Sequence, residues 1–214
     1  MTHKSKGQSL LENAYTLATP QDNRSYYDEF AATYDDDFAT ALGYEYPKAI
    51  ASVYREHASN EDLPVADIGC GTGLVAHALG LAPSQIDGID ISEEMLAKAR
   101  EKSLYRDTIR ADLTADLTPI KNEYGAVVSA GTFTSGHVGP EPLAQLLEIA
   151  RPGGLFVIGV NKLFFEKAKF EPVIRGLHDN GAIADLKVIE IPMYNKPGHD
   201  HSSDRAFALC YRKP

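Results

Sequence analysis

Residues 65–73 read Val65-Ala66-Asp67-Ile68-Gly69-Cys70-Gly71-Thr72-Gly73. The apolar residues before the glycines predict a short buried strand, and the apolar run over residues 74–81 predicts a helix packed on a sheet. The glycines permit positive φ and a close approach of the backbone to a ligand, while the N–H groups at a helix N-terminus attract an anionic or carboxylate end. The segment therefore predicts a ligand-binding turn.

Two common glycine-rich motifs fit this turn poorly. The dinucleotide fingerprint G-x-G-x-x-G needs a glycine at position 74, where the chain has Leu74, and the Gly-Lys-Ser/Thr of a P-loop is missing from the sequence. The chain has a different feature, a carboxylate at the end of the next strand: Asp90 is the last residue of the strand predicted over residues 85–90. An acidic residue about 20 positions past such a turn usually binds ribose hydroxyls.

With these motifs in this order, the chain resembles the class I S-adenosylmethionine-dependent methyltransferases. The likeness spans residues 60–160 and continues through Ala111-Asp112-Leu113 and Arg151-Pro152-Gly153-Gly154. It implies an α/β, Rossmann-like, doubly wound sheet of seven strands, mostly parallel, with an antiparallel C-terminal hairpin strand. The strings over residues 87–92, 111–114 and 127–140 resemble more closely the methyltransferase-like proteins of the Williams-Beuren syndrome region, and no substrate is carried over from that family.

The resemblance implies S-adenosylmethionine as the cofactor. Asp67 would order the turn or bind the amino group of the methionine part, Asp90 would hold the ribose, and Asp112 with Leu113 would hold the adenine. A second interpretation of Asp112, as an acid that only stabilises a turn, stays open. The implied cofactor-binding residues are Tyr34, Asp67, Gly69, Gly71, Gly73, Asp90, Ile91, Asp112, Leu113 and Ser129.

Residues 1–45 are expected to form a tail and a helical cap over the cofactor, and residues 46–214 the methyltransferase domain. A first amphipathic helix is predicted over residues 10–18, and Thr19-Pro20 starts a second one. Tyr27, Phe30 and Tyr34 would share one face of that helix. Residues 27–35 resemble the cap pattern of the family, in which aromatic rings lie near the sulfonium. Packing of Tyr27 and Phe30 in the core is the other interpretation.

The loop over residues 131–137 is expected to border the transferred methyl group, because ligands of open α/β sheets bind at the carboxyl ends of strands. His137 is the candidate catalytic residue, since a general base with a pKa of about 6.5 suits proton removal from a hydroxyl or amine. Alternatively, it only bonds the loop backbone. Asn161, Phe164 and Phe165 either line the acceptor pocket or belong to the core. A helix over residues 142–150 and strands over 155–160, 187–194 and 206–212 complete the pattern.

No metal is predicted. Asp35-Asp36-Asp37 is typical of a solvated helix end, because the loops that bind hard cations space their carboxylates more widely. The cluster of His199, Asp200, His201 and Asp204 has no helix or strand to hold it, and zinc takes at least three protein ligands.

The whole chain restricts the partners. Its 214 residues suit one α/β domain, and a net charge of -9 without a basic run disfavours nucleic acid. Two cysteines suit a reducing compartment, and no leader-like or 18-residue apolar segment occurs, so we expect a cytoplasmic protein without a membrane partner.

The expected function is methyl transfer to a small-molecule acceptor. A protein that binds the cofactor or a partner without turnover is the alternative, and an NAD-dependent oxidoreductase ranks last. The oligomeric state is left open.

Overall fold

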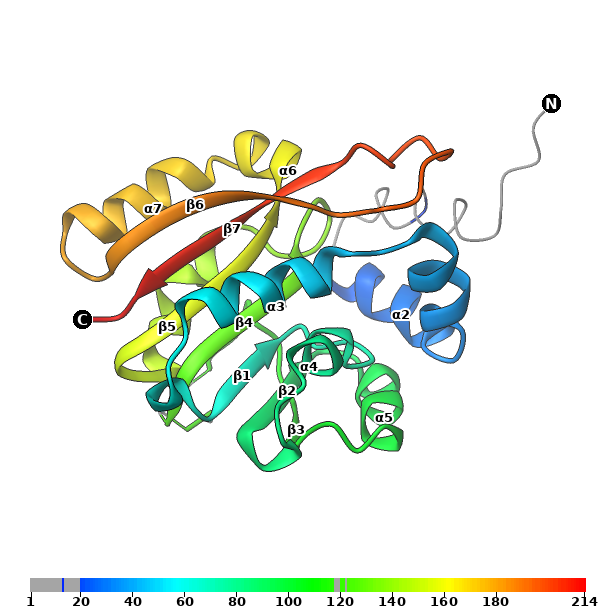
Figure 1. Ribbon diagram of the computed structural model, residues 1–214, viewed down its shortest axis with the longest axis horizontal. Helices are drawn as coiled ribbons and strands as arrows, with labels where there is room; N and C mark the ends of the chain where they lie inside the picture. The colour runs from blue at the N-terminus through cyan, green and yellow to red at the C-terminus, as the bar shows by residue number, and fades with distance from the viewer. Residues whose placement is uncertain (1–12, 14–19, 118–119, 122) are drawn as a thin grey trace.

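A mixed sheet forms the centre of the protein. The computed structural model describes residues 13, 20–117, 120–121 and 123–214, and in this part of the chain seven strands lie in the order β3-β2-β1-β4-β5-β7-β6 (Figure 1). Strands β1 to β5 pair in parallel, while β7 lies antiparallel between β5 and β6. This confirms the predicted fold class. The strands are β1 Val65–Ile68, β2 Ile86–Asp90, β3 Asp107–Arg110, β4 Tyr124–Phe133, β5 Ala150–Asn161, β6 Ala184–Pro192 and β7 Arg205–Arg212.

The strand order reverses at β1, which pairs with β2 on one side and with β4 on the other. The chain leaves β1 toward β2 and β3, then crosses back to β4 and continues to β5. Connections that leave neighbouring strands in opposite directions open a crevice at the carboxyl ends of those strands. The fold therefore places its binding crevice beyond the ends of β1 and β4.

Helices cover both faces of the sheet (Figure 1). Successive side chains of a strand point to opposite faces, so Leu155 and Val157 of β5 pack with residues of α3 and α4, while Phe156 and Ile158 pack with residues of α6 and α7. The two apolar cores confirm the doubly wound arrangement. The helices in the described part of the chain are α2 Pro20–Phe30, α3 Tyr46–His57, α4 Leu74–Leu79, α5 Glu93–Glu101, α6 Lys162–Lys167 and α7 Phe170–Asp179.

The N-terminal segment differs from the expectation of one helix that carries Tyr34. Helix α2 ends at Phe30, and a separate π-helix, Tyr34–Thr40, follows it. This second start puts Asp35, Asp36 and Asp37 in a first turn, where the positive end of the helix dipole favours carboxylates. Tyr27 and Tyr34 therefore belong to different elements. The helix expected over residues 10–18, except residue 13, and its neighbour Thr19 lie outside the described residues, as does the side chain of Phe30.

Other boundaries also differ from the predicted ones. The helix expected over residues 142–150 is two short 3₁₀ helices, Glu141–Leu143 and Gln145–Ile149, and β5 already begins at Ala150, which ends the helical segment. Strand β4 continues to Phe133 through an irregularity after Ser129, which takes residues 131–133 out of the predicted loop.

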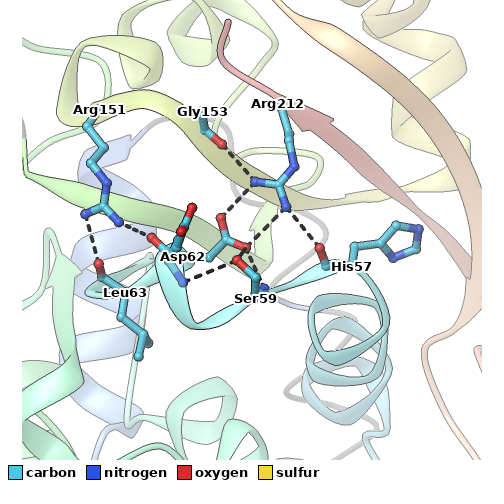
Figure 2. Close-up of polar contacts among 8 residues, drawn as sticks. His57, Ser59, Asp62, Leu63, Arg151, Gly153 and Arg212 are labelled. Atoms are coloured by element: carbon cyan, nitrogen blue, oxygen red, sulfur yellow. Dashed lines mark hydrogen bonds and ion pairs between the residues drawn. The ribbon is translucent and has the colours of Figure 1, made fainter.

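A polar network closes the end of the sheet opposite the crevice (Figure 2). Asp62, which is buried just before β1, accepts hydrogen bonds from Arg212 Nη1 at 2.8 Å and from the Ser59 N–H at 2.7 Å. Arg212 also donates to the Gly153 carbonyl at 2.8 Å, and Arg151 donates to the Leu63 carbonyl at 2.9 Å. The network ties the start of β1 to β5 and β7.

Burial would raise the pKa of Asp62, but the hydrogen bonds from Arg212 and Ser59 outweigh it and hold this pKa below its ordinary value. A carboxyl with a lowered folded-state pKa stabilises the fold above its unfolded pKa. The contribution of Asp62 is therefore present at neutral pH and is lost as the pH falls through the lowered pKa.

Replacing Arg212 by alanine leaves this buried carboxylate without its cation. We expect R212A to lower the free energy of unfolding by about 2–4 kcal/mol, because an unpaired buried charge is strongly unfavourable. Urea denaturation at pH 7 measures the change. The control R175A removes an exposed pair with Glu171 and should cost less than about 0.5 kcal/mol. Equal effects of the two variants would contradict the role of the network.

Candidate cofactor and acceptor site

A cavity lies at the carboxyl ends of β1, β2 and β4, where the strand order predicts a crevice. Its floor contains the turn after β1 and the residues that end β2. Its other walls come from the segment before β1, from the loop after β4 and from the residues after β6. The predicted residues on its lining are Tyr34, Gly69, Gly71, Asp90, Ile91, Asp112, Leu113 and His137.

The glycine turn is attached directly to β2. The N–H groups of Gly69 and Cys70 donate to the Ile89 carbonyl at 2.7 and 3.1 Å, and the Gly71 N–H donates to Asp90 Oδ2 at 2.8 Å. Gly71 has a φ of +53°, and no heavy atom lies within 4 Å of the position where its Cβ would be. This residue combines a conformation that favours glycine with open space in front of the backbone, as a ligand cradle requires.

Asp90 is fixed at the edge of the cavity. Its second oxygen accepts the Ser92 N–H at 2.9 Å, and the Ser92 hydroxyl in turn accepts the Met95 N–H at 3.0 Å as the N-cap of α5. Burial raises the pKa of Asp90, and the N–H bonds from Ser92 and Gly71 act against that rise. Both oxygens keep lone pairs for further donors, so the carboxylate can receive hydroxyl groups of a ligand.

Asp112 and Leu113 reach the cavity from the segment that follows β3. The Ala111 N–H donates to the Asp90 carbonyl at 2.9 Å, which places this segment beside the end of β2. One Asp112 oxygen accepts from the Thr114 N–H at 2.8 Å and from its hydroxyl at 2.6 Å. Asp112 therefore stabilises a turn and also lines the cavity, so the two interpretations of this residue are compatible.

Three predicted cofactor residues lie behind the lining. Asp67 is 1% exposed and accepts the Tyr105 hydroxyl at 2.7 Å. Ser129 is fully buried and donates to the Ile68 carbonyl at 2.8 Å. Gly73 starts α4 with a φ of +92°. None of the three residues is on the cavity lining.

Aromatic side chains form one wall, which we call the aromatic wall: Tyr27, Tyr34, Phe38, Tyr44 and Tyr194. Neighbouring ring centroids lie 5.9, 5.0, 5.2 and 5.5 Å apart in that order. All five residues line the cavity. Of these five residues, only Tyr27 and Tyr34 had a sequence signal. Tyr194 reaches the wall through an isolated antiparallel bridge with Tyr44, which the local sequence does not specify.

His137 lies in the loop after β4 and faces the cavity beside the aromatic wall. Its ring centroid is 5.3 Å from that of Tyr27, and burial lowers its pKa to about 4. The imidazole is therefore neutral at pH 7 and can accept a proton there, although it is a weaker base than a free histidine.

The other acceptor candidates belong to the core. The Asn161 side chain caps α6 by accepting the Phe164 N–H at 3.1 Å, and Phe165 stacks on Phe170 at 5.8 Å. The lining contains neither Asn161 nor the two phenylalanines that follow it. This arrangement favours the core interpretation of all three residues.

The described residues contain no group of three or more His, Cys, Asp or Glu side chains that is arranged to hold a metal ion. In the cluster of residues 35–37, Asp35 accepts a hydrogen bond from Lys102. In the cluster of residues 199–204, His201 pairs with Asp204 at 2.9 Å. Within the same part of the chain, no helix has the length and apolar character needed to span a membrane.

Known proteins resemble this chain in sequence and in fold. Residues 65–154 match the family model described as a methyltransferase domain. Methyltransferase-like protein 27 of Homo sapiens is 32% identical over 135 residues, which are 61% of this chain and 54% of that protein. Demethylmenaquinone methyltransferase of Chlorobaculum parvum is 33% identical over 140 residues, 61% of this chain and 56% of that protein. The chain thus spans little more than half the length of these two relatives.

A solved structure supports the same fold. An S-adenosylmethionine-dependent methyltransferase of Thermotoga maritima, described as a possible histamine N-methyltransferase, superposes with a TM-score of 0.58 and 15% identity, over 87% of this chain and 97% of that one. Sheet order, glycine turn and cavity define a class I methyltransferase fold. Within residues 65–154 the chain matches a methyltransferase domain, and its sheet has the strand arrangement of that fold.

Asp67 supplies a test of how tightly this turn is packed. Burial raises its pKa to about 7, against the effect of the Tyr105 hydrogen bond and with a contribution from the Asp90 charge. Because the folded-state pKa exceeds the unfolded value of about 3.9, the contribution of Asp67 to stability is complete below about pH 4 and is lost as the pH rises toward 7. We therefore expect the melting temperature of D67N, relative to the unmodified protein, to increase between about pH 4 and 7.

Thermal denaturation at a series of pH values measures this difference. D179N, at an exposed carboxyl group, is the control and should show a constant difference. A constant difference for D67N as well would contradict a buried, largely protonated Asp67.

Proposed function

We propose that the protein transfers a methyl group from S-adenosylmethionine to a small-molecule acceptor. The observation that carries this proposal is the Gly71–Asp90 pair on the cavity lining. It places an open glycine backbone 2.8 Å from a carboxylate whose two oxygens are already oriented by N–H donors. Asp112 and Leu113 lie on the same lining. This is a suitable set of groups for a nucleoside with an amino acid attached.

The cofactor roles follow from that arrangement. Gly69 and Gly71 would admit the methionine part, Asp90 would accept the ribose hydroxyls, and Asp112 with Leu113 would hold the adenine. Ile91 would pack on the adenine face, while Asp67, Gly73 and Ser129 would support the turn without direct contact. When bound, S-adenosylmethionine supplies an electrophilic methyl group on a sulfonium.

The protein's own contribution would be alignment and exclusion of water. Holding two reactants in the correct geometry can account for roughly 7–11 kcal/mol of a barrier. Tyr34 of the aromatic wall would face the sulfonium, which gains from a neighbouring ring. The acceptor's proton would pass to His137 or to water, and the electron pair of the broken carbon–sulfur bond would stay on sulfur.

The N-terminal segment would act as the cap over this site, with residues 1–45 as tail and cap and residues 46–214 as the catalytic domain. Two contacts of the described part support the role of a cap. Ser92, next to Asp90, donates to Asp28 of α2 at 2.5 Å, and Thr72 of the glycine turn donates to Asp35 at 2.5 Å. Both contacts join the segment before β1 to residues of the cofactor site.

A small-molecule acceptor is favoured by the net charge of -9, which disfavours nucleic acid. It is also favoured by the name of the Chlorobaculum relative, which refers to a quinone and not to a macromolecule. The two unpaired cysteines suit a cytoplasmic protein. A protein that binds the cofactor without turnover would share the first half of this site, so binding and product formation must be measured separately.

Asp90→Ala tests the cofactor site. Calorimetric titration with S-adenosylmethionine and S-adenosylhomocysteine should show binding to the unmodified protein, and D90A should weaken it about 100-fold or more, because two hydroxyls would lose a charged acceptor. The control E94A removes an exposed acid from the first turn of α5 and should bind normally. Normal binding by D90A would refute the ribose role, and no binding by the unmodified protein would refute the proposed function.

His137→Gln tests the catalytic role. With an acceptor that the protein methylates, we expect the kcat for S-adenosylhomocysteine formation to fall about 100-fold with little change in KM. The rate of the unmodified protein should show no limb near pH 6.5, since the base stays deprotonated down to its pKa of about 4. The control H178Q alters an exposed histidine of α7. An unchanged kcat for H137Q would leave alignment alone as the source of catalysis.

A further inference from the structure

The cavity has a one-sided distribution of charge. Its described lining contains two carboxylates, Asp90 and Asp112, and no lysine or arginine. The proposed cofactor roles use both carboxylates at the nucleoside end. The acceptor end is lined instead by the aromatic wall and by the loop after β4. This loop contributes two small polar residues, Thr134 and Ser135, and also His137 and Val138.

Three basic side chains near the cavity already have protein partners. Lys102 pairs with Asp35 and donates to the Thr72 carbonyl at 2.7 Å. Arg110 Nε donates to the Ile91 carbonyl at 3.3 Å, and Lys196 donates to the Thr40 carbonyl at 2.5 Å. Among the side chains that the structure describes, an acidic group entering the cavity would therefore have to displace one of these contacts to find a cation.

A carboxylate or phosphate that is buried without a cation loses its hydration and is strongly disfavoured. Two lining carboxylates add repulsion. Flat apolar surface, in contrast, gains from the stacked and edge-on rings of the aromatic wall, and a hydroxyl or amine can bond to Ser135 or Thr134.

We propose that the acceptor is a ring compound without negative charge, which carries the hydroxyl or amino group that is methylated. This inference rests on the proposed function and specifies its substrate class. A carboxylate, sulfate or phosphate on the acceptor would be excluded by the lining.

Three phenols of nearly equal size test the inference. 4-Hydroxybenzamide is neutral, 4-hydroxybenzoate is anionic and 4-(aminomethyl)phenol is cationic at pH 7.5. Each is titrated by calorimetry, at concentrations up to the millimolar range, into protein saturated with S-adenosylhomocysteine, which lacks the sulfonium charge. We expect the amide and the amine to bind at least about tenfold more tightly than the benzoate. A benzoate that binds equally well or better, or no binding by any of the three, would overturn the inference.

A designed cation provides the second arm. Ser135→Lys adds an ammonium group to the lining and should reduce or reverse the preference for the amide over the benzoate. Ser84→Lys adds the same charge at an exposed position before β2 and should leave the preference unchanged. Equal responses of the two variants would show that the lining does not set the preference, against the inference.

The titration separates this inference from the proposed function. If the protein does not bind S-adenosylhomocysteine but still binds the amide more tightly than the benzoate, the result would contradict the proposed cofactor. It would nevertheless support a pocket that disfavours anions. Protein that binds S-adenosylhomocysteine but prefers the benzoate would support the cofactor site and contradict the substrate class.

Discussion

The hydrogen bond from the Gly71 amide to the Asp90 carboxylate joins the ends of two neighbouring strands. It comes together with two further bonds, from Gly69 and Cys70 to the Ile89 carbonyl, so the turn after β1 rests on the end of β2. The turn can take this position only with left-handed backbone at its glycines. The cradle of the cavity, the orientation of Asp90 and the start of α4 all depend on this contact.

Burial shifts the pKa values of two ionisable groups near this contact in opposite directions. Asp67 has a pKa raised to about 7 below the turn, whereas His137 has a pKa lowered to about 4 above the cavity. Both shifts favour the uncharged form, which is the form that a poorly hydrated site stabilises. The acidic side chains on the described lining are Asp90 and Asp112, and the proposed discrimination between ligands by charge rests on them.

The local sequence was sufficient to predict those parts of the structure that depend on interactions within a few residues. The apolar run, the glycines and Asp90 predicted β1, the turn and the end of β2, because strand periodicity and glycine conformation act within a few residues. The same reasoning extended α2 too far, since helical spacing from Tyr27 to Tyr34 does not reveal a new start at Tyr34. It also could not find Tyr194, whose position depends on pairing across the fold.

The bridge between Tyr44 and Tyr194 has a consequence for synthesis of the chain. It is supported by the bond from the Glu45 N–H to the Met193 carbonyl at 2.9 Å and by that from the Asn195 side chain to Glu45 at 2.7 Å, the second of which joins residues 150 positions apart. A ribosome that has made β1 to β5 has produced the whole nucleoside half of the cavity, while the aromatic wall still lacks its last ring. The nascent protein would therefore have a place for the donor before it has a closed place for the acceptor.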